Sequence, residues 1–410
     1  MRDLLGWWGF GALSAALLTI AVVVLVRERQ RLRGLLARST AVPLLLFAGV
    51  CLVSALWSAY PLVTLAGSAV QIATALVGIA LLLLLPLRRL AVVFAWMVHT
   101  NLALSLVFEA VVALLPEHRL APFFTDYGSN APGAYYWSQG LLFTGQRIQG
   151  VVGNANLTCF LALLGGIVIC CLLAAGDIPK RLAIPALALD LLLAALTRSG
   201  TVIIAGAVVL AVAVVVVAYR RVSRGARLAL TAAALGVILL AALSSSRVSE
   251  PVLRVLGKGE DLTGRYEIWH IVGTLVAKQP VLGWGWVSYW APWVSPYNDL
   301  VVRGGVEYLQ AHNAYFDIEL QVGVPGLLAF AVLVGSVVLR ALRLAETRAP
   351  LTTLPILLVT ALLAQAMAES RLLIEGNWAL LVALSVILPW GRRHPAMAPE
   401  RGLKLQESAQ

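Results

Sequence analysis

His312 is the residue whose type and position point most directly to chemistry. It is one of five histidines in a chain that is 60% hydrophobic, and it stands where a long polar segment gives way to an apolar run. An imidazole at a membrane rim could remove a proton from a lipid-borne substrate, although a histidine at a helix start can also simply cap the helix. Asn313 follows it, and a Gly323-Val-Pro-Gly326 step lets the chain bend into the bilayer. We expect any reaction to take place here.

Four arginines are expected on the same membrane face as the histidine: Arg147, Arg198, Arg265 and Arg371. A guanidinium group binds phosphate through bidentate, charge-assisted hydrogen bonds, whereas a lone arginine can also extend to lipid headgroups. Arg198 and Arg371 fall in short outer loops, where positive charge is normally avoided. The set therefore predicts a diphosphate site. The acids nearest to Arg371, Glu369 and Glu375, could equally pair with it.

Aromatic residues crowd the segment that precedes the histidine, and Trp284 is the first of four tryptophans there. Tryptophan prefers the headgroup level of a membrane, so these residues could form an interfacial belt. The same depth would suit docking of an amphiphilic substrate. We therefore count Trp284, Tyr266 beside Arg265, and Asn313 among the predicted substrate-binding residues.

No metal or other cofactor is predicted. The chain has no Asp-x-Asp pair and no histidine pair four residues apart, and its four cysteines fall inside apolar runs. Arginine would then have to neutralise a leaving phosphate, and Asp299 or Glu307 would be the first to test if a metal were required. Asp190 interrupts an apolar run, where a carboxylate is costly, so it is either paired inside the bundle or a proton relay in a transporter.

The composition excludes a soluble globular protein, because the mean hydropathy is +0.88 and only 12% of residues are charged. Apolar runs of membrane-spanning length predict an all-α, polytopic helical bundle that forms a single integral-membrane domain over residues 1–410. Eleven spans are expected, near residues 7–26, 41–57, 65–86, 90–115, 155–176, 182–197, 201–219, 228–244, 323–342, 351–369 and 376–390.

The basic residues predict the orientation of the bundle. Most of the 31 Lys and Arg residues fall in one set of short loops and in the tail at 391–410, which the positive-inside rule places in the cytoplasm. With eleven spans the N-terminus lies outside. Two outer segments, 116–153 and 245–322, are too long for turns and predict a helical cap that carries His312. The net charge of +11 follows from this topology and requires no nucleic-acid partner.

These residues resemble the O-antigen ligase/polymerase superfamily of bacterial envelope glycosyltransferases. Its ligase signature is His, then Asn, Ser or Gln, then nine residues, then Gly-x-x-Gly/Thr/Tyr, and His312, Asn313, Gly323 and Gly326 match it in full. Supporting matches over about residues 45–390 are Arg147 before Gly150-x3-Asn154-x-Asn156, Arg198-Ser199, Gly264-Arg265-x3-Trp269 and Pro280-x2-Gly283-x-Gly285. The resemblance implies twelve spans, one more than the eleven counted here.

The resemblance also implies a reaction. The family transfers a preassembled glycan from undecaprenyl diphosphate to a hydroxyl of a lipid A–core sugar, at the periplasmic face of the inner membrane and with inversion at the anomeric carbon. His312 would act as the general base, and Arg147, Arg198 and Arg265 would bind the diphosphate. The implied partners are thus the lipid-linked O-antigen donor, the lipid A–core acceptor and membrane lipids.

Three alternatives stay open at the level of sequence. A polymerase of the same superfamily would use lipid-linked donors on both sides, but the Arg-x10-Gly pattern of some polymerases is missing from the outer loops. A protein O-glycosylating member often has a C-terminal periplasmic extension, which this sequence lacks. A transporter of an anionic solute would need more charged or broken helices at mid-bilayer than Asp190 alone.

Overall fold

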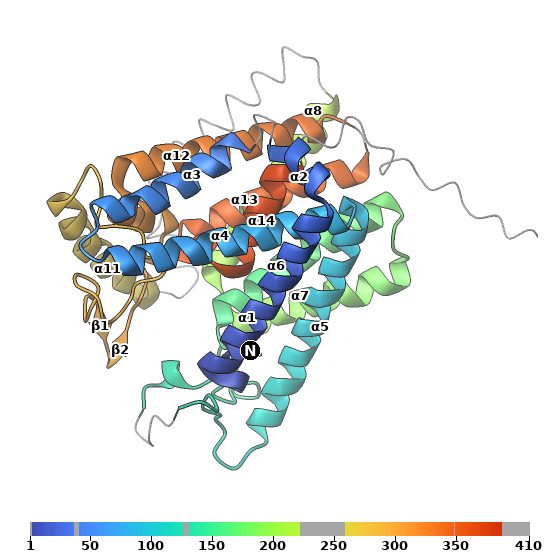
Figure 1. The fold of residues 1–410 in the computed structure, drawn as a ribbon. Helices are drawn as coiled ribbons and strands as arrows, with labels where there is room; N and C mark the ends of the chain where they lie inside the picture. The colour runs from blue at the N-terminus through green and yellow to red at the C-terminus, as the bar shows by residue number, and fades with distance from the viewer. Residues whose placement is uncertain (1, 37–40, 126–130, 222–258, 348, 388–410) are drawn as a thin grey trace, which may run out of the picture.

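A computed structural model of the protein describes residues 2–36, 41–125, 131–221, 259–347 and 349–387 (Figure 1). Its helices are α1 (Arg2–Arg27), α2 (Arg29–Leu36), α3 (Val42–Val53), α4 (Pro61–Leu84), α5 (Leu87–Ala113), α6 (Ala155–Ala175), α7 (Lys180–Thr197), α8 (Gly200–Arg221), α11 (Gly259–Lys278), α12 (Ala314–Ala345), α13 (Leu354–Ala366) and α14 (Glu375–Ile387). Strands β1 (Val302–Arg303) and β2 (Val306–Glu307) form a short antiparallel hairpin.

The protein is an all-α, multi-pass membrane protein. Helices α1, α4, α5, α6, α8 and α12 are each long and apolar enough to cross a membrane, and α3 and α13 are shorter apolar helices. Every expected span within the described residues coincides with a helix. The expected span at 228–244, the start of the large loop at 245–322 and the tail at 391–410 lie outside the described residues.

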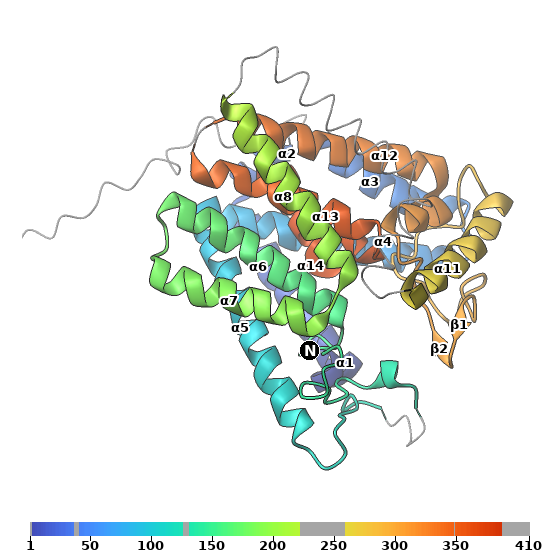
Figure 2. The same cartoon turned by 180° about the vertical axis from the view of Figure 1, so that it is seen from behind.

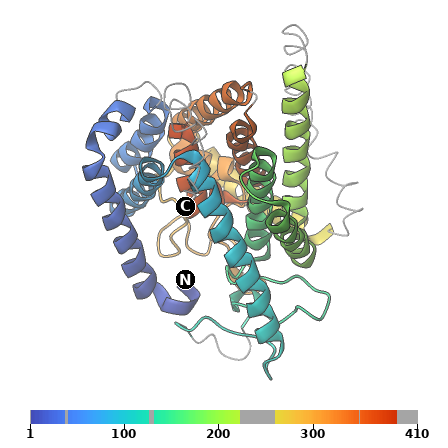
Figure 3. The same ribbon diagram turned by 90° about the vertical axis from the view of Figure 1, so that its right-hand side faces the viewer.

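The helices pack in pairs that are distant in sequence. Helix α3 lies along α12, and α4 lies between α1 and α14, as Figure 1 shows. On the other side, α6 packs against α5 and α7, and α8 packs against α13 (Figure 2). Viewed from the side, α1 and α8 lie on opposite flanks of the bundle (Figure 3). Phe47 lies at the centre of the α3, α12 and α14 contact, with its ring centroid 5.3 Å from that of Phe330 and 5.6 Å from that of Trp378.

Several helices begin or end together at one end of the bundle, which we call the His312 end. Helices α6, α8 and α12 begin there, and α7 and α13 end there. Asparagine side chains cap two of the starts: Asn154 accepts hydrogen bonds from the first backbone N–H groups of α6, and Asn313 does so for α12. Helix α7 ends at Arg198, whose φ of 48° turns the chain into α8.

The two long loops cover the His312 end. Residues 114–125 and 131–154 form irregular structure with one 3₁₀ turn, Gly133–Tyr135, and residues 279–313 form irregular structure with the β1–β2 hairpin. Tyr135 links the two loops by donating a hydrogen bond to Gly305 O over 3.2 Å. Within the part of the loops that the structure describes, the cap is therefore helical in α11 and in the 3₁₀ turn, and irregular elsewhere apart from the β1–β2 hairpin.

A kink at Gly323 divides α12 into a short segment under the cap and a long segment through the bundle. Gly323 has φ 58° and ψ −153°, and a Cβ atom there would lie 2.1 Å from Val281 O. Only glycine allows this conformation and this approach of two backbones. The Val324 N–H donates to Val281 O over 2.9 Å, and Gly285 N donates to Gln321 O over 2.8 Å. The expected bend is confirmed, and it docks the Pro280-x2-Gly283-x-Gly285 segment onto the helix.

Candidate active site

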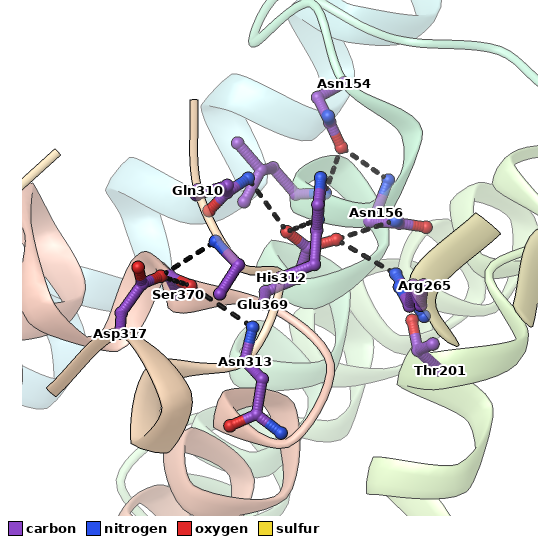
Figure 4. A network of polar contacts seen from close by, with 12 residues as sticks. Asn154, Asn156, Thr201, Arg265, Gln310, His312, Asn313, Asp317, Glu369 and Ser370 are labelled. Atoms are coloured by element: carbon purple, nitrogen blue, oxygen red, sulfur yellow. Dashed lines mark hydrogen bonds and ion pairs between the residues drawn. The ribbon is translucent and has the colours of Figure 1, made fainter. Parts of the chain in front are cut away.

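The Glu369 carboxylate lies at the centre of a polar network at the His312 end (Figure 4). Its Oε2 lies 3.1 Å from His312 Nδ1 and accepts from Gln310 Nε2 at 3.4 Å. Its Oε1 accepts from Asn156 Nδ2 at 3.0 Å and from Arg265 Nη2 at 3.4 Å. The side chain is only 5% exposed. Four residues from α6, α11 and the loop before α12 thus converge on one carboxylate that follows α13.

Glu369 is ionised at neutral pH in this setting. Burial raises the pKa of its carboxyl group, but the hydrogen bond and charge of His312, together with Arg265 and Asn156, outweigh that effect. The pKa therefore lies below its ordinary value. An ionised carboxylate so placed can stabilise a positive charge that forms on the imidazole.

His312 is held in an uncommon backbone conformation, with φ 51°. Because a carboxylate accepts hydrogen bonds, Nδ1 carries the proton in the neutral imidazole and donates it to Glu369. The Nε2 lone pair is then left to bind a proton, and among the described residues Nε2 makes no hydrogen bond. The side chain is 20% exposed, so this edge of the ring can be reached. The geometry suits a general base.

Asn156 connects Arg147 to the carboxylate. Its Oδ1 accepts from Arg147 Nη2 at 2.7 Å and from Ser199 Oγ at 2.9 Å, while its Nδ2 donates to Glu369. Arg147 Nε also donates to Thr197 O at 3.0 Å, at the end of α7. The oxygen and the nitrogen of the Asn156 amide are thus both hydrogen-bonded. Arg147 contacts Asn156 and Arg265 contacts Glu369, so two arginines flank this amide–carboxylate pair.

Glu109 of α5 fixes the loop that carries Arg147. This buried carboxylate accepts from the backbone N–H groups of Gln149 at 2.9 Å and of Gly150 at 2.6 Å, and from Ser138 Oγ at 2.8 Å. Gly150 has φ 69°, and a Cβ atom there would lie 2.8 Å from Thr158 Oγ1. The glycine turn and the Glu109 carboxylate together hold the loop between Arg147 and Asn154.

Arg265 and Trp269 both reach the chain around His312 from one face of α11. They are four residues apart, which places them on the same side of a helix. Arg265 contacts Glu369, and Trp269 Nε1 donates to Ala311 O at 3.0 Å. The Arg-x3-Trp spacing of the motif therefore places both side chains on one helix turn, with Arg265 at Glu369 and Trp269 at Ala311.

The structure brings His312, Arg265 and Arg147 together, and it places the other predicted residues around them. Asn313 caps α12, with its Oδ1 3.0 Å from Tyr315 N. Arg198 is exposed at the end of α7, and Tyr266 is 45% exposed on α11. Trp284 is half-buried and donates to Leu275 O at 3.1 Å, so it packs against α11. Gly323 forms the kink of α12, and Gly326 is buried in the helix three residues later.

The sequence left the partner of Arg371 open, and the structure resolves it. Arg371 pairs with Glu375 at 3.3 Å, while Glu369 points the other way, to His312 and Arg265. Glu369 was missed as a site residue because an acid two positions from an arginine suggested a local pair. The one signal in the sequence was an acid in a short outer loop at the end of an apolar helix.

Asp190 is paired inside the bundle, as one of the two sequence interpretations predicted. Its Oδ2 lies 3.2 Å from His99 Nε2, and the pair joins α7 to α5. In the described part of the chain, no group of three or more His, Cys, Asp or Glu residues is arranged to hold a metal ion.

No curated protein matches the chain. Residues 183–331 match the family model described as O-antigen ligase. The matched segment contains Arg198, Arg265 and His312, whereas Arg147 and Glu369 lie on either side of it. This match supports placing the chain in the O-antigen ligase superfamily, as its motifs predicted.

Proposed function

We propose that this protein is an O-antigen ligase, a glycosyltransferase that moves a preassembled O-antigen polysaccharide from undecaprenyl diphosphate to a hydroxyl of a lipid A–core sugar. The observation that carries the proposal is the contact between His312 Nδ1 and Glu369 Oε2, with Arg265 on the same carboxylate. The match of residues 183–331 to an O-antigen ligase model supports the reaction class.

His312 acts as the general base in this proposal. The acceptor hydroxyl gives its proton to Nε2 as its oxygen attacks the anomeric carbon of the donor sugar, and Glu369 stabilises the imidazolium that forms. The bond between the anomeric carbon and the diphosphate oxygen breaks in the same step, so the configuration at that carbon inverts. The proton later leaves His312 to water.

The departing diphosphate gains negative charge, and arginines stabilise it. A guanidinium group carries five N–H donors in a planar fork, so Arg265 can hold Glu369 and a phosphate oxygen together. Arg147, linked through Asn156 to the same carboxylate, and Arg198, at the adjoining turn, complete the set. Arg371, Tyr266 and Trp284 are proposed to contact the substrates farther from the reacting atoms.

The active site is proposed to face the periplasm from the inner membrane. The basic loops between α1 and α2, α4 and α5, and α6 and α7 lie at the end of the bundle away from His312. The positive-inside rule assigns that end to the cytoplasm. Both substrates are amphiphiles, and a site at helix ends under a loop cap can receive sugars from above and lipid from the side.

The glycolipids of a strain that lacks the gene test this function. Deletion should leave lipid A–core without O-chains, while long polymerised chains accumulate on undecaprenyl diphosphate. Wild-type protein should restore the ladder, and a His312→Asn variant produced at the same level should not. Core that bears a single repeat unit in the deletion strain would overturn the ligase assignment in favour of a polymerase. Donor trapped in the cytoplasmic leaflet would indicate a transporter.

A further inference from the structure

Asp317 is a buried carboxylate in the first turn of α12 that does not itself touch His312 or Glu369. It is 1% exposed and lies one helix turn after the Asn313 cap. Its Oδ1 accepts from Trp290 Nε1 at 2.6 Å, and its Oδ2 accepts from the backbone N–H of Ala311 at 3.0 Å and from the Ser370 hydroxyl. All three partners are donors, so the group binds them as a carboxylate.

Each of the two residues that donate to Oδ2 is adjacent in sequence to His312 or Glu369, the proposed catalytic pair. Ala311 directly precedes His312, and Ser370 directly follows Glu369. His312 and Glu369 are 57 residues apart in sequence and belong to segments that reach the site from different helices. One oxygen atom therefore ties the two segments together beside the 3.1 Å contact between His312 Nδ1 and Glu369 Oε2.

Ser370 extends this arrangement to the other side of His312. Its Oγ donates to Asp317 and accepts from the backbone N–H of Asn313 at 3.2 Å. The backbone N–H groups of the two residues that flank His312 are thus held: that of Ala311 by Asp317 directly, and that of Asn313 through Ser370. Figure 4 shows the contact between Asn313 and Ser370. His312 has φ 51°, a conformation that a non-glycine residue keeps only when its surroundings enforce it.

We infer that Asp317 is a positioning residue, which holds His312 and Glu369 at hydrogen-bond distance through Ala311 and Ser370. This inference rests on the proposed function, because it assigns to Asp317 the geometry of the proposed base. An amide cannot replace the carboxylate, because the NH₂ group of the Asp317→Asn variant would face a donor whichever way the amide turned. It would meet either Trp290 Nε1, or the Ala311 N–H and the Ser370 hydroxyl. Small displacements of a base from its substrate cost about 10²-fold in rate.

The test compares three variants of the full-length protein in a purified transfer assay with undecaprenyl-diphosphate-linked O-antigen and lipid A–core. Asp317→Asn should lower kcat about 10²-fold and leave the donor KM within about threefold of wild type. Ser370→Ala keeps the carboxylate but removes the link to the segment of Glu369, and should lower kcat about tenfold, again without a change in KM. Trp290→Phe is the matched control, since it removes the donor to Oδ1 and leaves both Oδ2 contacts in place. Its kcat should stay within about threefold of wild type.

Melting temperature and detergent-solubilised yield separate positioning from folding. If Asp317→Asn does not fold, Ser370→Ala decides the question alone. The inference is overturned if Asp317→Asn or Ser370→Ala folds and keeps the wild-type kcat. It is also overturned if Trp290→Phe lowers kcat as much as those two variants do. His312→Asn with full turnover would overturn the proposed function itself, and the positioning role with it. If His312→Asn loses turnover while Asp317→Asn keeps the wild-type kcat, only the positioning role is rejected.

Discussion

At the scale of the residue, Glu369 gives His312 a defined chemical state. A carboxylate 3.1 Å from Nδ1 fixes the imidazole tautomer and stabilises the protonated ring once Nε2 has accepted a proton. The same carboxylate contacts Arg265, so the proposed base and a candidate phosphate-binding residue share one hydrogen-bond partner. The reaction would then depend on distances around a single side chain.

His312→Asn should abolish transfer while the protein still folds. Asparagine tolerates the positive φ of this position better than alanine does, so strain adds little to the result. Loss of a general base costs about 10²–10⁴-fold in rate. His118→Asn is the matched control, because His118 is another histidine with positive φ, 50°, in the outer loop after α5. Turnover of His312→Asn in purified protein above a tenth of wild type would reject the base assignment.

Arg265→Lys should fail almost as badly as Arg265→Ala. The planar guanidinium can hold Glu369 and a phosphate oxygen together, and an ammonium group cannot reproduce that fork. Arg303→Lys serves as the control, since Arg303 pairs with the exposed Glu267 at 3.2 Å on the outer hairpin. Transfer rates at saturating donor check the prediction, and full activity of Arg265→Lys would reduce this arginine to a generic positive charge.

Glu369→Gln should lower turnover about 10²-fold and remove a pH-dependent part of the stability. The folded pKa of Glu369 lies below its ordinary value, so its ionised form stabilises the fold above the unfolded pKa of about 4.3. That contribution is lost as the pH falls through the folded pKa. The difference in melting temperature between wild type and Glu369→Gln should therefore shrink as the pH falls below about 4.3 and through the folded pKa of Glu369. A difference that widens in acid would contradict the assignment.

The sequence predicted the histidine and the arginines of the site, but not its carboxylates. His312, Arg265 and Arg147 carry motif spacings and unusual positions, and the structure brings them together. Glu369 and Asp317 could not be predicted in the same way, because their roles depend on contacts between segments 53 to 57 residues apart. No local spacing records such contacts.

At the scale of the element, α12 shows how a glycine sets the direction of a helix. Gly323→Ala should destabilise the protein by at least about 2 kcal/mol, because a Cβ atom would lie 2.1 Å from Val281 O at a positive φ. Gly335→Ala in the same helix is the control, since nothing lies within 4 Å of its added Cβ. Thermal unfolding in detergent measures both, and equal melting temperatures would show that the kink is not required.

Hydropathy predicted the elements well where the chain crosses the membrane, and poorly in the cap. The span expected at 90–115 is α5, Leu87–Ala113, and the bend expected at Gly323 is present. Apolar length is a strong signal in lipid because every backbone group must be satisfied within the helix. The irregular segment at 279–313 carries no such period, since its shape depends on glycine turns and on tryptophan packing.

At the scale of the whole molecule, the orientation of the bundle can be tested with two single cysteines. Glu117 is exposed in the loop after α5, at the His312 end, and Glu346 is exposed after α12, at the opposite end. With the four native cysteines replaced, a membrane-impermeant maleimide should label Glu117→Cys from the periplasm. It should label Glu346→Cys only after the inner membrane is opened. The reverse pattern would place the site in the cytoplasm.

The wide separation of the residues around Glu369 limits how this protein could be recombined with its relatives. Asn156 and Glu369 are 213 residues apart, and both lie outside the segment that matches the family model. A transplant of residues 183–331 into a homologous host would carry His312, the proposed base, but leave Glu369 and Asn156 behind. Such a chimera should transfer glycan only when the host supplies both groups. The residues of the candidate site therefore extend from Arg147 to Ser370, beyond both ends of the segment that matches the family model.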